Sequence, residues 1–222
     1  MKSVLTFLSE VSRNNNREWF AAHRSLYEAS EAEFRDFAQR LLDGIAAFDA
    51  SVCGLSLRDC TYRIYRDTRF SLDKTPYKTW KGVYVVRGGK KSGYAGYYVH
   101  IETSGCFIYA GLHCPEPTIL RSVREEIIDN GDAIVEAIAA TNGFTLVEEN
   151  ALKRNPKDFP PGHKHDALLR LKELGIMKRL DTDAVERGGE ALIKAILLDL
   201  QTAKPLIDIL NRAVEYAYEE MM

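Results

Sequence analysis

The first part of the chain carries apolar side chains at helical spacing. Asn15, followed three residues later by Glu18, has the form of a helix N-cap with its reciprocal acid. Aromatic and aliphatic residues then recur every three or four positions as far as Phe48. This spacing predicts one long helix, or two joined helices, over residues 16–48.

The periodicity changes at Thr61 from helical spacing to alternation. Alternating β-branched and aromatic side chains are typical of strands, and the Gly–Gly and Ser–Gly pairs between them are typical of hairpin turns. Connections this short require antiparallel neighbours, because a parallel crossover takes about a dozen residues or more. We expect strands at residues 62–66, 81–87, 94–102 and 106–112, with a further short strand at 144–147.

Helical spacing returns after the strands. Pro117 suits the first turn of a helix, and Gly131 is expected to begin a second one. Residues 150–165, which include three prolines, are expected to form an irregular loop before further helices in the C-terminal third. Helices, then strands, then helices predict an α+β fold. We expect a single domain, residues 1–222, in which N- and C-terminal helices cover an antiparallel sheet of about four to five strands.

Composition excludes several classes of protein. The apolar share of 45% and the charged share of 28% exclude a disordered chain, and no apolar run reaches the roughly 18 residues of a membrane helix. The short apolar stretch 4–8 is followed by Glu10 without a cleavage site, so no secretory signal is expected. The cysteines, spaced unlike a CxxC zinc clamp, are Cys53, Cys60, Cys106 and Cys114. The sequence predicts a cytoplasmic protein with reduced thiols, no metal, no cofactor and no membrane partner.

Positive charge is concentrated in one stretch of the sequence. Residues 62–91 hold nine Lys and Arg against two Asp, a local charge of +7, whereas the whole chain carries −2. Residues 153–172 contribute a further +4, so the rest of the chain carries −13. Charge is therefore segregated along the sequence.

Two explanations fit this segregation. In one, acidic helices pack beside the basic stretch and the charges neutralise each other. In the other, the arginines bind an anion, since a guanidinium matches phosphate or carboxylate with two hydrogen bonds. Exposed ion pairs stabilise a fold little, so stability alone is a weak reason for three arginines in seven residues. We favour a basic anion-binding pocket around residues 63–81. Its expected members are Arg63, Arg66, Arg69, Lys74, Tyr77, Lys78 and Lys81.

The alternation also predicts how this pocket is built. Arg63 and Arg69 should share one face of the first strand and its continuation. The loop 70–78 should fold back over that face, so that the sheet forms the floor of a concave pocket with Tyr65 as a donor. Arg66, on the opposite face, is expected to pair with an acid from the covering helices.

Six segments, in order over nearly the whole chain, carry a family resemblance. They are FLSEVSRNNNREWFAAHRSLYE, RIYRDTRFSLDKTPYKTW, GYYVHIE, GLHCPEPTILRSVRE, LKRNPKDFP and PLIDILNRA. They resemble the domain-of-unknown-function family numbered 2461, whose main motif, RDxRFSxDKxPYK, falls within residues 63–78. The resemblance implies one compact intracellular domain and no particular reaction. Asp158 stands where the family pattern has Gly, which weakens any site in the second basic loop.

Three classes of function are open on this sequence. We favour binding of a phosphorylated or other anionic small ligand. The alternative is an enzyme acting on a phosphate-containing substrate, for which Asp67, Asp73 and His100 are the candidates for proton transfer. The second alternative is nucleic-acid binding through a basic β-surface with aromatic faces. A pI near 6.2 argues against a strong nonspecific nucleic-acid binder.

A group of potential zinc ligands also falls on neighbouring predicted strands. It consists of His100, Cys106, His113 and Cys114. Half-buried cysteine and a hydrogen-bonded core histidine are commoner than a metal site. We therefore expect no metal at this group.

Overall fold

A computed structural model describes residues 1–149 and 151–222, so Asn150, at the start of the expected irregular loop, lies outside the described residues. The helices are α1 (Lys2–Arg13), α2 (Arg17–Ala22), α3 (Arg24–Phe48), the 3-10 turn η1 (Ala50–Val52), α4 (Leu57–Cys60), α5 (Pro117–Ala139), α6 (Asp166–Leu169), α7 (Thr182–Arg187), α8 (Gly189–Thr202) and α9 (Lys204–Glu220). The strands are β1 (Trp80–Val86), β2 (Gly96–Glu102), β3 (Phe107–Leu112), β4 (Thr145–Leu146) and β5 (Leu174–Arg179).

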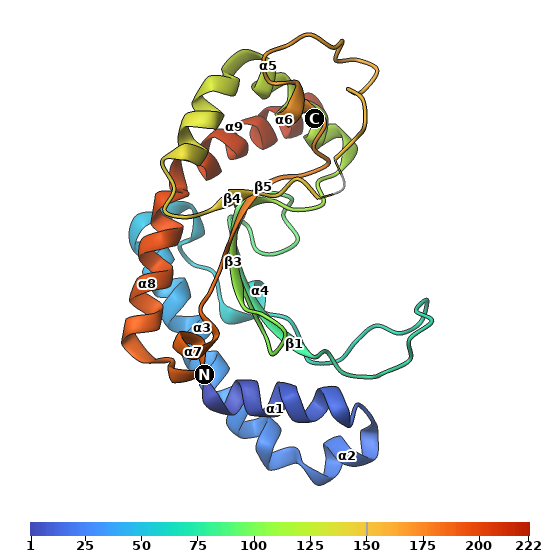
Figure 1. Cartoon of the computed structure of the whole chain (residues 1–222), viewed down its shortest axis with the longest axis vertical. Helices are drawn as coiled ribbons and strands as arrows, with labels where there is room; N and C mark the ends of the chain where they lie inside the picture. The colour runs from blue at the N-terminus through green and yellow to red at the C-terminus, as the bar shows by residue number, and fades with distance from the viewer. Residues whose placement is uncertain (150) are drawn as a thin grey trace.

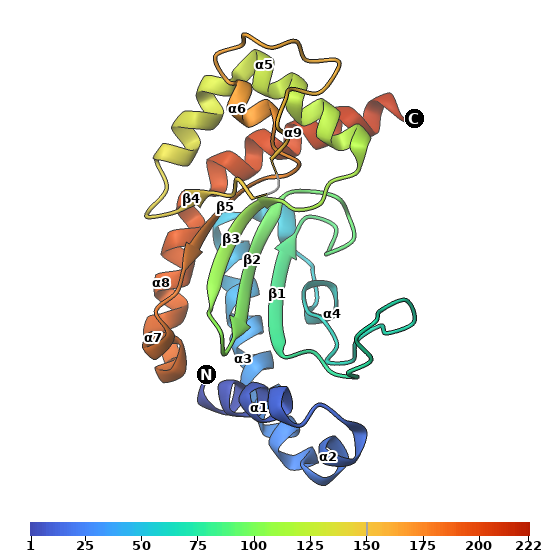
Figure 2. The same ribbon diagram turned by 45° about the vertical axis from the view of Figure 1, so that its right-hand side comes forward.

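The five strands form one antiparallel sheet in the order β1–β2–β3–β5–β4. Within it, Val99 of β2 lies between Val83 of β1 and Ile108 of β3. α3 from the N-terminal part and α8 from the C-terminal part lie side by side along one face of the sheet (Figures 1 and 2). The predicted α+β fold, with helices from both ends over an antiparallel sheet, is confirmed.

The face of the sheet beneath α3 and α8 is the core. Val83, Tyr97, Val99 and Ile108 are all 1% exposed or less. These residues occupy alternate positions of their strands, so their side chains share one face. Fully burying an aliphatic side chain contributes roughly 1.5–3 kcal/mol, which makes this face the main source of the sheet's stability.

The N-terminal helices differ from the expectation in two details. No helix was expected over α1, although its buried residues Val4, Phe7, Leu8 and Val11 follow helical spacing and pack against α3. The predicted N-cap is also displaced by one residue. Asn16, not Asn15, accepts a hydrogen bond from the Trp19 backbone N–H at 2.8 Å. Of the two forms predicted for residues 16–48, the structure has the two joined helices, α2 and α3, which meet at His23.

Among the later elements, one expectation is confirmed and two are wrong. The second helix predicted from Gly131 is the part of α5 that follows a kink at Asn130, whose φ of −130° and ψ of 24° are not helical. The predicted strand 62–66 is not part of the sheet, and within it Tyr65 makes one isolated bridge, to Tyr77. β5 lies in a stretch where no strand was expected. In residues 1–149 and 151–222, no helix combines the length and the apolar composition required to cross a membrane.

Candidate functional site

Residues 62–78, here called the arm, form a hairpin that projects from the edge of the sheet (Figure 1). Its two sides are joined by backbone hydrogen bonds, in which Arg66 donates to Pro76 at 2.9 Å and Lys78 donates to Ile64 at 2.8 Å. Phe70 and Leu72, at its tip, are 97% and 102% exposed. The arm extends away from the sheet, so it does not fold back to form the concave pocket that was expected (Figure 2).

The root of the arm is fixed to the N-terminal helices. The side chain of Asn15 donates to the backbone carbonyl of Tyr77 at 2.9 Å and accepts from its backbone N–H at 3.0 Å. The Tyr77 ring is buried and stacks on Phe20 with the ring centroids 4.1 Å apart. Asn15 is therefore an anchor of the arm rather than the helix cap that was predicted.

Two arginines of the arm are neutralised within the arm itself. Arg69 donates two hydrogen bonds to Asp67, at 3.0 and 2.7 Å, and this contact lowers the pKa of Asp67 to about 2. Arg66 pairs with Asp73, not with an acid of the covering helices as expected. The backbone N–H of Thr75 and then Arg66 lower the pKa of Asp73 to about 2. Both carboxylates named as proton-transfer candidates are thus held ionised by the arm.

The lysines of the arm bind backbone carbonyls. Lys74 donates to the carbonyl of Thr68 at 2.9 Å, and Lys78 donates to those of Arg63 and Tyr65 at 2.6 and 2.9 Å. Burial lowers the pKa of Lys78. Arg63 is exposed and has no ion pair among the described residues. Anion binding by these three cations stays a prediction.

Lys81 lies on the core side of the sheet. Its side chain is only 5% exposed, and its ammonium group pairs with Glu31 of α3 at 2.5 Å. The same ammonium lies 4.7 Å from the ring centroid of Phe34. Lys81 and Tyr77 are thus part of the packed core, and the basic segment 63–81 is not the single pocket that was expected.

The opposite face of the sheet is not covered by α3 or α8 and carries a band of aromatic rings. Figure 2 shows this face toward the viewer, with those two helices behind the sheet. The ring centroids of Tyr62 and Trp80 are 5.6 Å apart, those of Trp80 and His100 5.4 Å, and those of His100 and Phe107 4.6 Å. Tyr98 packs against Phe107 at 5.9 Å. We call these five residues the aromatic band.

Cations lie at both ends of the aromatic band. The Lys78 ammonium lies 5.7 Å from the ring centroid of Trp80, and that of Lys90 lies 5.9 Å from Tyr62. At the other end, the exposed Arg179 of β5 pairs in register with the last residue of the band. The arrangement offers flat rings between positive charges.

His100 lies in the middle of the aromatic band and is held at both ring nitrogens. Its Nδ1 lies 2.7 Å from the hydroxyl of Tyr98, and its Nε2 lies 3.2 Å from Glu102. Burial lowers the pKa of His100, although Glu102 opposes this effect. A neutral imidazole between a hydroxyl and a carboxylate can pass a proton from one to the other.

Gly82 makes room for this arrangement. It lies beside His100 in the register of β1 and β2. A Cβ atom at Gly82 would lie 2.6 Å from the hydroxyl of Tyr98, closer than carbon and oxygen approach without displacement. The glycine therefore lets Tyr98 lie across β1 and reach His100.

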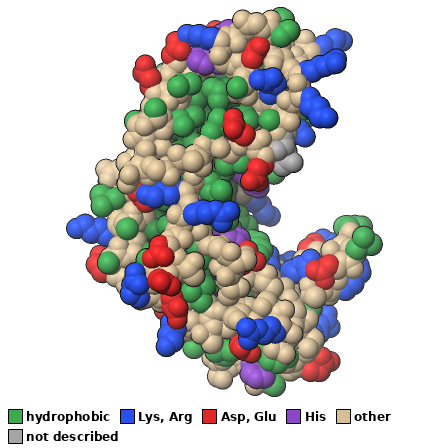
Figure 3. Space-filling view, viewed as in Figure 1, with side chains coloured by type: hydrophobic (Ala, Val, Ile, Leu, Met, Phe, Trp, Pro, Cys, Tyr) green, Lys and Arg blue, Asp and Glu red, His purple; other side chains and the backbone are tan. Residues whose placement is uncertain are grey.

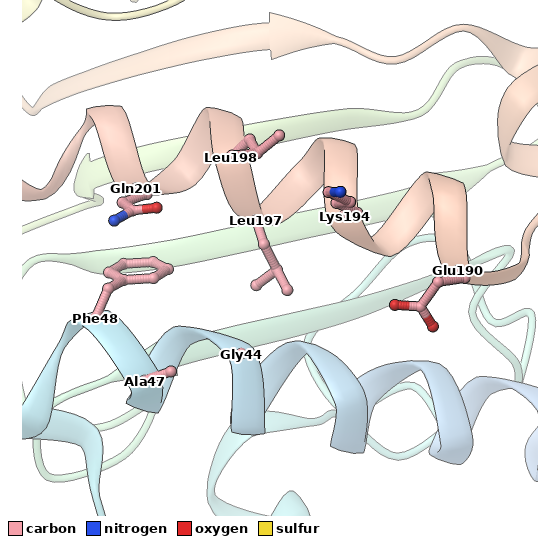
Figure 4. A pocket seen from close by; sticks show the side chains of 8 residues that line it. All are labelled: Gly44, Ala47, Phe48, Glu190, Lys194, Leu197, Leu198 and Gln201. Carbon is pink, nitrogen blue, oxygen red and sulfur yellow. The ribbon is translucent and has the colours of Figure 1, made fainter.

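The molecule is hollowed between the arm and the helices at the opposite end. Figure 3 shows this hollow on the right, with Lys and Arg side chains on both of its flanks. A second depression, of about 310 Å³, lies between α3 and α8 on the far side of the sheet (Figure 4). There Leu197 points toward Gly44 and Leu198 points away. That groove is a packing feature of two helices and contains none of the predicted site residues.

Of the aromatic band, only His100 was predicted from the sequence as a candidate residue, and a β-surface with aromatic faces was only the second alternative, although the strands that carry the band were predicted. Trp80, Tyr98 and Phe107 alternate with the buried residues of their strands. The pattern that could have revealed the band is the recurrence of aromatic residues at the strand positions that alternate with the buried valines. The site prediction was based on positive charge and therefore fell on the arm.

Comparison with known protein families gives one match to the chain. The profile of one family, described as Conserved hypothetical protein (DUF2461), matches residues 3–208. This range includes the arm, the aromatic band and every strand of the sheet. No curated protein and no solved structure matches the chain. The function must therefore be argued from the site itself.

Proposed function

The chain belongs to the DUF2461 family of conserved hypothetical proteins, and we propose that it binds single-stranded nucleic acid across the aromatic band. The observation that carries this proposal is the uncovered sheet face on which half-buried rings lie between cations. Proteins that bind single strands combine such stacking rings with a positively charged groove. The rings of Tyr62, Trp80, His100 and Phe107 follow one another across the sheet, which suits a chain of bases better than one small ligand.

Stacking supplies most of the expected affinity. A base stacked on an aromatic side chain contributes roughly 1–3 kcal/mol, and the contact tolerates any base because every base has a flat face. Trp80 and Phe107 lie on either side of His100, and His100 stacks on Phe107 with the planes 16° apart, so bases can stack only on the ring surfaces that these contacts leave open. The proposal therefore predicts weak dependence on base sequence.

Phosphate contacts are expected to be few. Lys78, Lys90 and Arg179 lie at the ends of the band, whereas Arg66 and Arg69 are already paired with carboxylates of the arm. Each phosphate neutralised on a single strand contributes about 0.7 to the slope of log affinity against log salt. Three contacts give a slope of about −2 for log affinity against log salt. This weak dependence on salt is consistent with the net charge of −2 of the whole chain.

The experiment compares two phenylalanines of equal size. Binding of a fluorescent 15-nucleotide single strand, a length of about one site, is measured by anisotropy. Phe107→Ala removes a ring of the band, and Phe70→Ala removes an exposed ring at the arm tip. We expect Phe107→Ala to weaken binding about tenfold and Phe70→Ala to change it little. Thermal unfolding of both variants confirms that they are folded.

The proposal fails if the unsubstituted chain does not bind the strand, or if both variants bind it equally well. A melting temperature raised by a mononucleotide but not by the strand would instead support the small phosphorylated ligand. In that case the flat rings would still hold a base, but a single one.

A second candidate function is acid–base catalysis on a phosphate-containing substrate. It is favoured by the contacts of His100 with Tyr98 and Glu102, which prepare an imidazole for proton transfer. Turnover of a phosphodiester that is lost in Glu102→Gln, which removes the carboxylate beside His100 and leaves the aromatic band intact, while strand binding persists, would establish it.

A further inference from the structure

Three side chains with metal-binding atoms meet at one end of the sheet. His113 and Cys114 directly follow β3, and Glu173 directly precedes β5. Because Leu112 and Leu174 are the last residues paired between these strands, the chain brings the three together. Their potential ligand atoms all lie within 4.8 Å of one another, and no other such group occurs in residues 1–149 and 151–222.

One of the distances between these atoms is that of a zinc site. With zinc bonded to sulfur at about 2.3 Å and to nitrogen or oxygen at about 2.0–2.2 Å, tetrahedral ligand atoms lie about 3.3–3.7 Å apart. Cys114 Sγ lies 3.5 Å from His113 Nε2, whereas Glu173 Oε2 makes a hydrogen-bond contact of 2.6 Å with the other ring nitrogen, Nδ1. Zinc binding by all three residues therefore requires His113 to turn away from Glu173, and its side chain, 66% exposed, is free to do so.

The backbone holds the cysteine in place beside the acid. Cys114 has φ 46°, the one left-handed conformation at a non-glycine residue in the described part of the chain. Its backbone N–H donates to Glu173 Oε2 at 3.1 Å. Such a conformation is sparsely populated and persists where surrounding contacts enforce it. Here the contact that enforces it comes from a potential ligand.

We propose that His113, Cys114 and Glu173 bind one zinc ion. Sulfur and nitrogen donors favour zinc over magnesium or calcium, which take oxygen ligands. A thiolate and a carboxylate would neutralise the two charges of the ion, with the thiol proton released to solvent. Three protein ligands leave a fourth position for water, as in open zinc sites.

This site differs from the group considered in the sequence. Cys114 and Glu173 are 59 residues apart, and only the pairing of β3 with β5 joins them. His100 and Cys106, which were considered with them, are not part of the structural group. The proposal is independent of nucleic-acid binding at the aromatic band.

The test is zinc binding by the metal-free full chain in competition with a chromophoric chelator. We expect one equivalent of zinc, and about tenfold weaker binding in each of Cys114→Ser, His113→Asn and Glu173→Gln. Cys53→Ser is the matched control, because Cys53 is also exposed and is not part of the group. It should bind zinc as the unsubstituted chain does.

A second readout uses both exposed thiols of one molecule. Iodoacetamide labelling, located by mass spectrometry, should be slowed by zinc at Cys114 and unchanged at Cys53. Equal protection of both thiols would overturn the proposal. So would zinc binding that survives His113→Asn and Glu173→Gln. Binding of less than one equivalent, or none at micromolar zinc, would also overturn it.

Discussion

The root of the arm, where it joins β1, and the tip of the arm hold ion pairs in opposite surroundings. At the root, Lys81 of β1 pairs with Glu31, and the two side chains are 5% and 32% exposed. At the tip, Arg69 pairs with Asp67 in solvent, and the two side chains are 77% and 50% exposed. Both ion pairs involve the basic segment 63–81, but they differ in how far their side chains are exposed to solvent.

The difference shows that a run of charge in the sequence need not form one site. A buried pair becomes strongly destabilising when one partner is lost, because the other charge remains without water. An exposed pair is screened by solvent and contributes little to stability. The segment 63–81 therefore joins a structural anchor to a freely exposed tip.

The largest loss of stability is expected from Glu31→Gln. This change leaves the ammonium of Lys81 buried without its carboxylate, which should lower the free energy of unfolding by about 3 kcal/mol. Urea denaturation at pH 7 measures it.

The control for this prediction is the double variant Glu31→Gln with Lys81→Met. Methionine fills a similar volume without charge, so the double variant should recover most of the lost stability. If Glu31→Gln costs as little as an exposed pair does, the contrast between root and tip is wrong.

A smaller loss of stability is expected from Asn15→Ala. The change leaves the backbone N–H and carbonyl of Tyr77 without their partners, which should cost about 2 kcal/mol. Hydrogen exchange should show faster exchange at the Tyr77 amide in particular. Asn16→Ala, which removes a helix cap one residue away, is the control and should leave that amide protected. Equal exchange at the Tyr77 amide in both variants would contradict an anchoring role for Asn15.

Local patterns in the sequence predicted most of the sheet. Alternation located β1, β2 and β3 to within two residues, because each strand has a buried face. The strand expected at 62–66 failed for a local reason. Pro76 lies opposite Arg66 and has no N–H to return a hydrogen bond, so the ladder ends there.

Contacts between residues far apart in the chain could not be predicted from the sequence. Lys81 was assigned to an anion site because its partner, Glu31, lies 50 residues away on another element. β5 was missed because Lys178 interrupts its apolar alternation, and the partner that allows this, Asp199, lies on α8 at 2.7 Å. In both cases a charged residue occupies a core-facing position, and only the fold shows the acid that pairs with it.

The carboxylates of the tip should titrate at low pH. Asp67 and Asp73 have pKa values of about 2, below the value of 3.8 of an unperturbed aspartate, so they favour the folded arm above about pH 4. This stabilisation is lost as the pH falls through about 2. Carboxyl chemical shifts measured by NMR between pH 6 and pH 1.5 (roughly the range that spans both pKa values) would show it.

A substitution tests which contact lowers the pKa of each aspartate. Arg69→Ala should raise the pKa of Asp67 toward its ordinary value and leave that of Asp73 unchanged, since Asp73 is held by Thr75 and Arg66. A pKa of Asp67 that stays at about 2 in the variant would show that Arg69 is not its cause.

The smallest effect on stability is also expected from Arg69→Ala. Its pair with Asp67 is exposed, so the melting temperature of the ligand-free protein should equal that of Arg13→Ala, which removes an exposed arginine from α1. Because the two variants make the same change in net charge, any difference in binding of a single strand measures position rather than charge. Weaker binding by Arg69→Ala alone would extend the binding face from the aromatic band onto the arm. A sharp fall in melting temperature in Arg69→Ala would instead make the tip a structural element like the root, and the contrast between them would not hold.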